Sequence, residues 1–144
     1  MYRTIVVGVD GSDASEAALA LAQQLLDPAG RIVLATVFPR YCGLARPSSG
    51  YFYVDALREQ AAQDLEQADL RLDPGVRRER RLLADVSVPR ALHDLAERVE
   101  ANAIVLGAGR EESAGGVAKW LLRHGNVRVL AASCAPALAA PAPA

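Results

Sequence analysis

Lysine is almost absent from this chain of 144 residues, in which Lys119 is the only lysine among 16 basic side chains. A phosphate-binding loop of the G-x-x-x-x-G-K-[ST] type needs a lysine directly after its last glycine. Lys119 stands instead within an expected helix, and no such string occurs. The scarcity of lysine therefore excludes P-loop nucleotide hydrolysis.

Cysteine and long hydrophobic runs are also scarce. Cys42 and Cys134 are far apart and lie in no C-x-x-C motif, which argues against a disulfide framework and against a zinc site. The first apolar run reaches Asp10 after only a few residues, too soon for a signal-peptide core or a membrane span. We therefore expect a cytoplasmic protein that does not enter a membrane.

An excess of charge of one sign is missing as well. The 16 basic and 17 acidic residues leave a net charge of −1, so the sequence lacks the basic surface of a nucleic-acid-binding protein. Four arginines do cluster at residues 77–81, but Glu79 interrupts them and no aromatic side chains accompany them. This pattern favours a solvated edge strand whose charges discourage unwanted pairing.

The composition that remains, 51% hydrophobic and 23% charged, is typical of one globular domain. Apolar runs alternate with amphipathic segments along the chain, which predicts a doubly wound parallel α/β sheet. Strands are expected at 4–9, 31–38, 76–84, 103–106 and 127–132, and helices at 12–26, 53–72, 88–100 and from Gly115 or Gly116 to His124. The Pro/Ala-rich residues 135–144 are expected to form a disordered tail after a domain at 1–134.

Ligands of doubly wound sheets bind beyond the carboxyl ends of the strands, where the strand order reverses. That rule directs attention to Asp10 and to the loop that opens at Gly107. The sequence VVGVDGS at 6–12, followed by VLGAG at 105–109 and GGVAKWLLRHGNVRVL at 115–130, resembles the universal stress protein family over nearly the whole chain.

The resemblance implies a five-stranded parallel sheet of the adenine nucleotide α-hydrolase-like type, with the strand order 3-2-1-4-5. It also implies a stress-response protein that binds an adenine nucleotide, either ATP or AMP. Family members often dimerise through the last strand, and Val127 and Val129 have the apolar character for such pairing. A solvent-facing edge strand is the alternative for these two residues.

In the family, the aspartate equivalent to Asp10 belongs to the nucleotide site, where its carboxylate can accept hydrogen bonds from a ribose hydroxyl or an adenine amino group. Asp10 could instead only cap the following helix, although Asp13 is the better placed cap. Val37 and Leu106 end two expected strands and could form apolar walls against an adenine ring. Ordinary core packing is the alternative for both.

The phosphate end departs from the family pattern G-x2-G-x9-G followed by Ser or Thr. Gly107 matches the first glycine, Arg110 stands where the second is due, and Gly109 replaces it only in a shifted register. Gly115 and Gly116 occupy the place of the final pair. Gly115 follows Gly107 too closely, so that about five residues of the loop are missing.

Charge in the shortened loop also matters, because Glu111 and Glu112 oppose a triphosphate. Backbone N–H groups of Gly115, Gly116 and Val117 could still bind an anion if a helix starts there. A remodelled nucleotide site and a site that has lost nucleotide binding therefore both stay open.

No residue pattern for catalysis is evident. A G-x-S-x-G nucleophile elbow would need glycine where Glu111 stands, and His93 and His124 have no neighbours at metal-ligand spacing. We expect both histidines to be surface or helix-end residues, and no metal site. The sequence thus predicts binding and signalling, with two alternatives: an interaction module acting through dimerisation or a protein partner, and a slow ATPase.

One aromatic cluster, at residues 51–53, stands beside a long loop. It could close over the mouth of the ligand site or fasten the start of the second helix, and the sequence does not choose between these roles.

Overall fold

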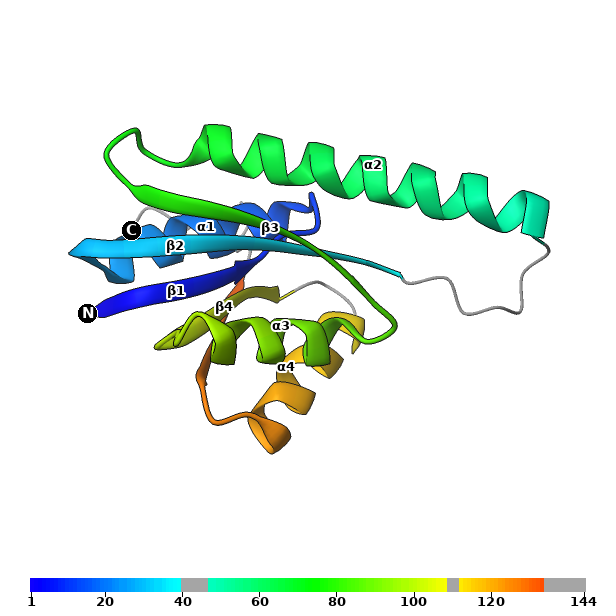
Figure 1. Ribbon diagram of the computed structural model, residues 1–144. Helices are drawn as coiled ribbons and strands as arrows, with labels where there is room; N and C mark the ends of the chain where they lie inside the picture. Colours follow the sequence, from blue (N-terminus) through cyan, green and yellow to red (C-terminus); the bar gives the residue numbers. More distant parts are fainter. Residues whose placement is uncertain (40–46, 109–111, 134–144) are drawn as a thin grey trace, which may run out of the picture.

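Strands and helices alternate along the whole chain in the computed structural model, which describes residues 1–39, 47–108 and 112–133 (Figure 1). The order confirms the predicted β-α pattern. The elements are β1 (Tyr2–Gly8), α1 (Asp13–Leu25), β2 (Leu26–Pro39), α2 (Pro47–Arg71), β3 (Arg77–Asp85), α3 (Val88–Arg98), β4 (Ala103–Ala108), α4 (Glu112–His124) and β5 (Arg128–Ser133).

The five strands form one parallel sheet in the order β3-β2-β1-β4-β5, which confirms the expected architecture. The β-branched residues of β1 are covered on both faces, and Val6 and Val7 are fully buried. From β1 the chain adds β2 and β3 on one side, then crosses to place β4 on the other. The strand order therefore reverses between β1 and β4, where Val7 pairs with Val105.

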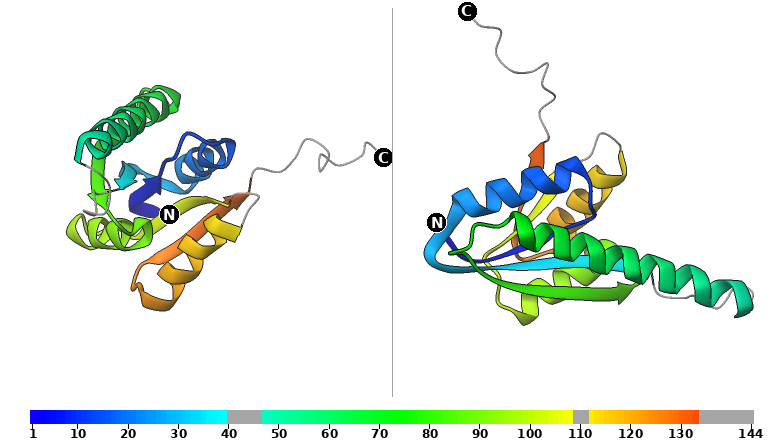
Figure 2. Two further views of the ribbon diagram at one scale, coloured as in Figure 1. Left: turned by 90° about the vertical axis from the view of Figure 1, so that its right-hand side faces the viewer. Right: turned by 90° about the horizontal axis from the view of Figure 1, so that it is seen from above.

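Helices cover both faces of the sheet, with α1 and α2 on one side and α3 and α4 on the other (Figure 2). Each face has its own apolar core. On the first face, Ile5, Ile32 and Val105 pack with Ala18 and Leu19 of α1 and Leu65 of α2. On the second, Val6, Val33 and Ile104 pack with Leu92 and Leu95 of α3 and Leu121 of α4.

The side chain of Ser12 caps the start of helix α1. The prediction that Asp13 is the capping residue is therefore wrong. Ser12 has an extended backbone, and its Oγ accepts a hydrogen bond from the Ser15 amide at 3.2 Å. Asp13 is already the first helical residue, where its charge faces the positive end of the helix. The chain then enters β2 directly at Leu26, five residues before the predicted strand start.

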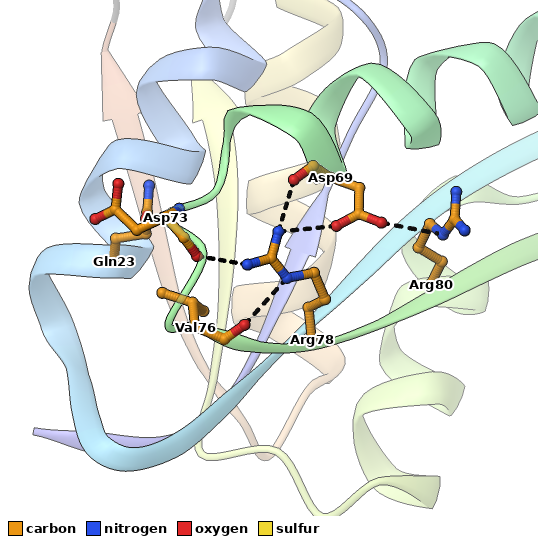
Figure 3. Close-up of polar contacts among 6 residues, drawn as sticks. All are labelled: Gln23, Asp69, Asp73, Val76, Arg78 and Arg80. Carbon is orange, nitrogen blue, oxygen red and sulfur yellow. Dashed lines mark hydrogen bonds and ion pairs between the residues drawn. The ribbon is translucent and has the colours of Figure 1, made fainter.

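Strand β3 is an edge strand, as predicted, but Arg78 and Arg80 form ion pairs rather than being merely solvated (Figure 3). Arg78 contacts the Asp69 carboxylate of α2 at 2.9 Å and donates to the Asp69 carbonyl at 2.7 Å. It also donates to the Val76 and Asp73 carbonyls. Arg80 reaches the second Asp69 oxygen at 3.3 Å. These contacts fasten the edge strand to the carboxyl-terminal end of α2.

Glu79, which interrupts the arginine run in the sequence, lies on the opposite face of β3. Its carboxylate pairs with Arg31 of β2 at 3.0 Å and with Arg81 of its own strand at 2.5 Å. Successive side chains of a strand point to opposite faces, so the mixed charges give each face of β3 its own ion pairs.

Several expectations fall on parts of the chain that the structure leaves undescribed. Residues 135–144, Cys42 and Cys134 lie outside the described ranges. Residues 51–53 belong to α2, which starts at Pro47, earlier than expected, but their side chains are not described. Within residues 1–39, 47–108 and 112–133, the helices do not combine the length and hydrophobicity that crossing a membrane requires.

Candidate functional site

A cleft of about 260 Å³ opens at the carboxyl ends of β1 and β4, where the strand order reverses. Its walls come from four strand ends or loops and from three helices. The lining residues are Gly8, Val9, Asp10, Ser15, Ala35, Val37, Val88, Leu92, Leu106, Gly107 and Val117. Five of the eight predicted site residues, Asp10, Val37, Leu106, Gly107 and Val117, thus lie around one cleft.

Asp10 follows β1 at the mouth of the cleft and is held by a small hydrogen-bond network. Its Oδ1 accepts from the Ser12 amide at 2.9 Å and from the Ser12 hydroxyl at 2.5 Å. Its own amide donates to the buried Ser15 Oγ at 3.4 Å. Asp10 therefore orients the residue that caps α1 instead of capping the helix itself. Among the described residues, nothing donates to the other carboxylate oxygen, Oδ2.

The backbone beneath Asp10 stays paired beyond the end of β1. The Val9 amide donates to the Ala35 carbonyl at 2.8 Å, and the buried Thr36 hydroxyl donates to the Val9 carbonyl at 2.9 Å. Because both polar groups of Val9 are engaged, the strand end is held rigidly. These hydrogen bonds fix the backbone that precedes Asp10.

Apolar side chains form the walls of the cleft. Val37 is half-buried, while Leu106 is only 7% exposed and covers the space above Gly8. A Cβ atom on Gly8 would lie 2.7 Å from the Leu106 Cδ2 atom, so glycine makes room for this wall. Val37 and Leu106 both line the cleft and pack with the α3–α4 core.

Gly107 has a packing role that sequence reasoning did not anticipate. A Cβ atom there would lie 2.4 Å from the Ala14 carbonyl carbon, much closer than side chains approach backbone. The first turn of α1 therefore rests directly on the backbone of β4. This close approach brings Asp10 and Gly107 to the same cleft.

The predicted start of the last helix, at Gly115 or Gly116, is wrong. The helix starts at Glu112, before Gly115 and Gly116, so the amides of both glycines and of Val117 lie inside it. The amides without helical partners belong to the residues of the first turn, from Glu112 to Ala114. Val117 still reaches the cleft, through its side chain. Gly109 and Glu111 lie outside the described residues.

Three lining residues, Ser15, Val88 and Leu92, were not singled out from the sequence. Ser15 is 3% exposed, and a polar residue on the buried face of α1 was the signal that could have identified it. Leu92 belongs to the apolar face of α3, which the sequence pattern assigns only to the core. Val88 is the first residue of α3, directly after its capping residue, Ser87.

The prediction that both histidines are surface or helix-end residues is confirmed for His124 and wrong for His93. His124 ends α4 and is exposed, as predicted, but the His93 side chain is only 15% exposed and packs against Trp120. No group of three or more His, Cys, Asp or Glu side chains suited to a metal ion occurs in the described part of the chain.

The fold is that of a doubly wound α/β protein, and its cleft lies at the strand-order reversal, where sheets of this kind bind their ligands. The sequence matches the model of the universal stress protein family over residues 1–133, and the chain belongs to that family. No curated protein sequence matches it significantly.

Solved structures agree with this assignment. A universal stress protein family member from Burkholderia pseudomallei is 33% identical, with 90% of this chain and 95% of that chain covered and a TM-score of 0.73. A universal stress protein in complex with cAMP is 23% identical (90% and 96% covered, TM-score 0.64). An Arabidopsis thaliana family member with AMP bound is 12% identical (91% and 91% covered, TM-score 0.62).

Proposed function

We propose that this chain is a cytoplasmic stress-response protein that acts by binding and signalling, with an adenine nucleotide held in a remodelled cleft between β1 and β4. The observation that carries the proposal is the position of Asp10, which stands at the mouth of an apolar cleft with Oδ1 engaged by Ser12. The free oxygen faces no competing donor among the described residues.

The chemistry of the lining suits the nucleoside part of such a ligand. Val37, Leu92 and Leu106 offer apolar surfaces for a flat ring, and the Asp10 carboxylate offers an acceptor for ribose hydroxyls or an adenine amino group. The volume of about 260 Å³ is near the lower end of ordinary ligand pockets, which span about 300–1,000 Å³. It suits one base and sugar better than a dinucleotide.

The bound ligands of the structural neighbours support the same class of compound, because one holds cAMP and another holds AMP. Asp10 is the only ionisable side chain among the residues lining the described cleft. In the sequence, Glu111 and Glu112 follow Gly107 within five residues, and negative charge there opposes a long phosphate chain. We therefore place AMP and cAMP ahead of ATP among the candidate ligands.

Isothermal titration calorimetry with AMP, cAMP and ATP, with and without magnesium, tests the proposal. Asp10→Asn keeps an oxygen for Ser12 but removes the charge, whereas Asp10→Ala removes both. We expect both variants to weaken binding at least about tenfold, since a hydrogen bond to a charged group contributes about 1.5–3 kcal/mol. Asp55→Asn, at an exposed position of α2, is the matched control and should bind like the parent protein.

A second candidate function is an interaction module that has lost nucleotide binding and acts through dimerisation or a protein partner. The observation that favours it is the missing part of the phosphate loop together with its two glutamates. The absence of both binding heat and a thermal shift at millimolar nucleotide would replace the first proposal by this one. Release of phosphate from ATP above the buffer rate would instead favour the slow ATPase.

A further inference from the structure

The two histidines of the chain lie on either side of its single tryptophan, between α3 and α4. The His93 ring meets Trp120 edge-on, with ring centroids 6.2 Å apart and an interplanar angle of 73°. The His124 ring stacks on Trp120 at 4.5 Å with an angle of 26°. One indole thus contacts both imidazole rings of the chain.

His93 lacks a hydrogen bond at a buried nitrogen. Its Nε2 is shielded from water and has no hydrogen-bond partner among the described residues, although Glu97 Oε1 is 3.3 Å away. Its Nδ1 lies 3.7 Å from Asp94 Oδ1. A protonated ring carries a donor at each nitrogen, so it would face two carboxylates with two donors.

His124 stands at the carboxyl-terminal end of α4, where the helix dipole favours a positive charge. Its Nδ1 is 3.0 Å from the Trp120 carbonyl oxygen, which holds the ring over the indole. Protonation would leave this contact intact, with Nδ1 as the donor, and would add a cation–π attraction to the stacked pair.

Other charged groups around this cluster are few and exposed. On α3, Arg98 borders a surface hollow together with Asp94 and Glu97. On α4, Lys119 and Arg123 are exposed. Within the described ranges, the ion-pair partner of both Asp94 and Glu97 is His93.

The packing around His93 links the cluster to the end of α4. A Cβ atom on Gly125 would lie 3.3 Å from the His93 Cδ2 atom and 2.6 Å from the Leu121 carbonyl oxygen. The turn after α4 therefore closes directly over the ring. These contacts connect His93 to the end of α4.

We propose that His93 and His124 form a proton-sensitive clamp on Trp120, which tightens the contact between α3 and α4 as the pH falls. Protonation of His93 adds attraction to Glu97 and Asp94, and protonation of His124 strengthens its stack on the indole.

The clamp also reaches the cleft. Leu92 precedes His93 on α3, Val117 lies one turn before Trp120 on α4, and both line the cleft. Tightening of the two helices therefore restrains two of its walls. This coupling to ligand affinity rests on the proposed function, whereas the clamp itself does not.

Intrinsic fluorescence of the ligand-free protein tests the clamp, because Trp120 is the only tryptophan. Between pH 8 and 5 we expect a sigmoidal loss of Trp120 emission, since a stacked imidazolium quenches indole. His124→Gln should remove most of that change. A flat titration of the parent protein, or an unchanged one in His124→Gln, would overturn the proposal.

Three further measurements test the proposal, and the first needs no variant. In the unmodified protein, NMR should show the Trp120 indole resonance moving with the histidine ring resonances as the pH changes, and a static indole resonance contradicts the clamp. Unfolding by urea should show a larger stability loss for His124→Gln at pH 6 than at pH 8.

AMP affinity should rise about fivefold over the same fall in pH. If AMP fails to bind at either pH, the proposed function fails and the fluorescence result still decides the clamp.

Discussion

Arg78 of the edge strand β3 and Asp69 of helix α2 are joined twice, by an ion pair of 2.9 Å and by a hydrogen bond of 2.7 Å from the guanidinium to the Asp69 carbonyl. Both side chains are at least three-quarters buried. The most buried charge of this arginine-rich edge strand is therefore satisfied within the fold.

Removal of the Asp69 carboxylate should therefore destabilise the fold. Asp69→Ala leaves Arg78 without its ion pair and Arg80 without its contact, and we expect a loss of about 2–3 kcal/mol, because buried charges without partners are costly. Urea unfolding measures it. Glu16→Ala, which breaks the exposed ion pair with Arg71, is the control and should cost less than about 1 kcal/mol. Equal losses would contradict the argument.

Gly107 should tolerate no side chain. Because a Cβ atom would stand 2.4 Å from the Ala14 carbonyl carbon, Gly107→Ala must push α1 away from β4, at a cost of about 1–3 kcal/mol. Gly75→Ala is the matched control, since its Cβ would meet nothing within 4 Å and its stability should be unchanged or slightly higher. Thermal unfolding compares the two. An unaltered midpoint in Gly107→Ala would show that the close approach is absent.

The cap of α1 predicts a smaller and local effect. Ser12→Ala removes the acceptor for the Ser15 amide and the partner of Asp10, and should cost about 1 kcal/mol. Asp13→Ala keeps the cap and should cost less, about 0.3–1 kcal/mol from the helix dipole. Chemical denaturation of both variants decides which residue caps the helix. A larger loss of stability for Asp13→Ala would favour Asp13 as the capping residue.

The family resemblance implies a homodimer that pairs through β5, and this gives another prediction. β5 forms an edge of the sheet, Val129 is half-buried, and Val127 directly precedes the strand. Light scattering at several concentrations should give twice the mass of one chain, and Ala131→Asp, at an exposed position of the strand, should lower it. Leu122→Asp, at an exposed position of α4, is the control. A monomer at every concentration would argue against pairing through β5.

Much of the fold was predictable because local patterns decide it. The β-branched residues of β1 identify a strand buried on both faces, and the apolar spacing of α3 identifies a helix with one buried side. Helix starts were less predictable. Ser12 and Asp13 are both good caps, and only the extended backbone at Ser12 decides between them. At α4 the glycines suggested a start that the helix in fact precedes.

By itself, the sequence determined the alternation of strands and helices, the absence of a P-loop motif and the candidate role of Asp10, since each depends on residue type and spacing along the chain. The tertiary structure decided which distant residues share the cleft and how the arginines of β3 are paired. It also decided that His93 and His124 meet at Trp120. These relationships depend on the register of the sheet and on how helices lie across it, and contacts between distant residues fix both.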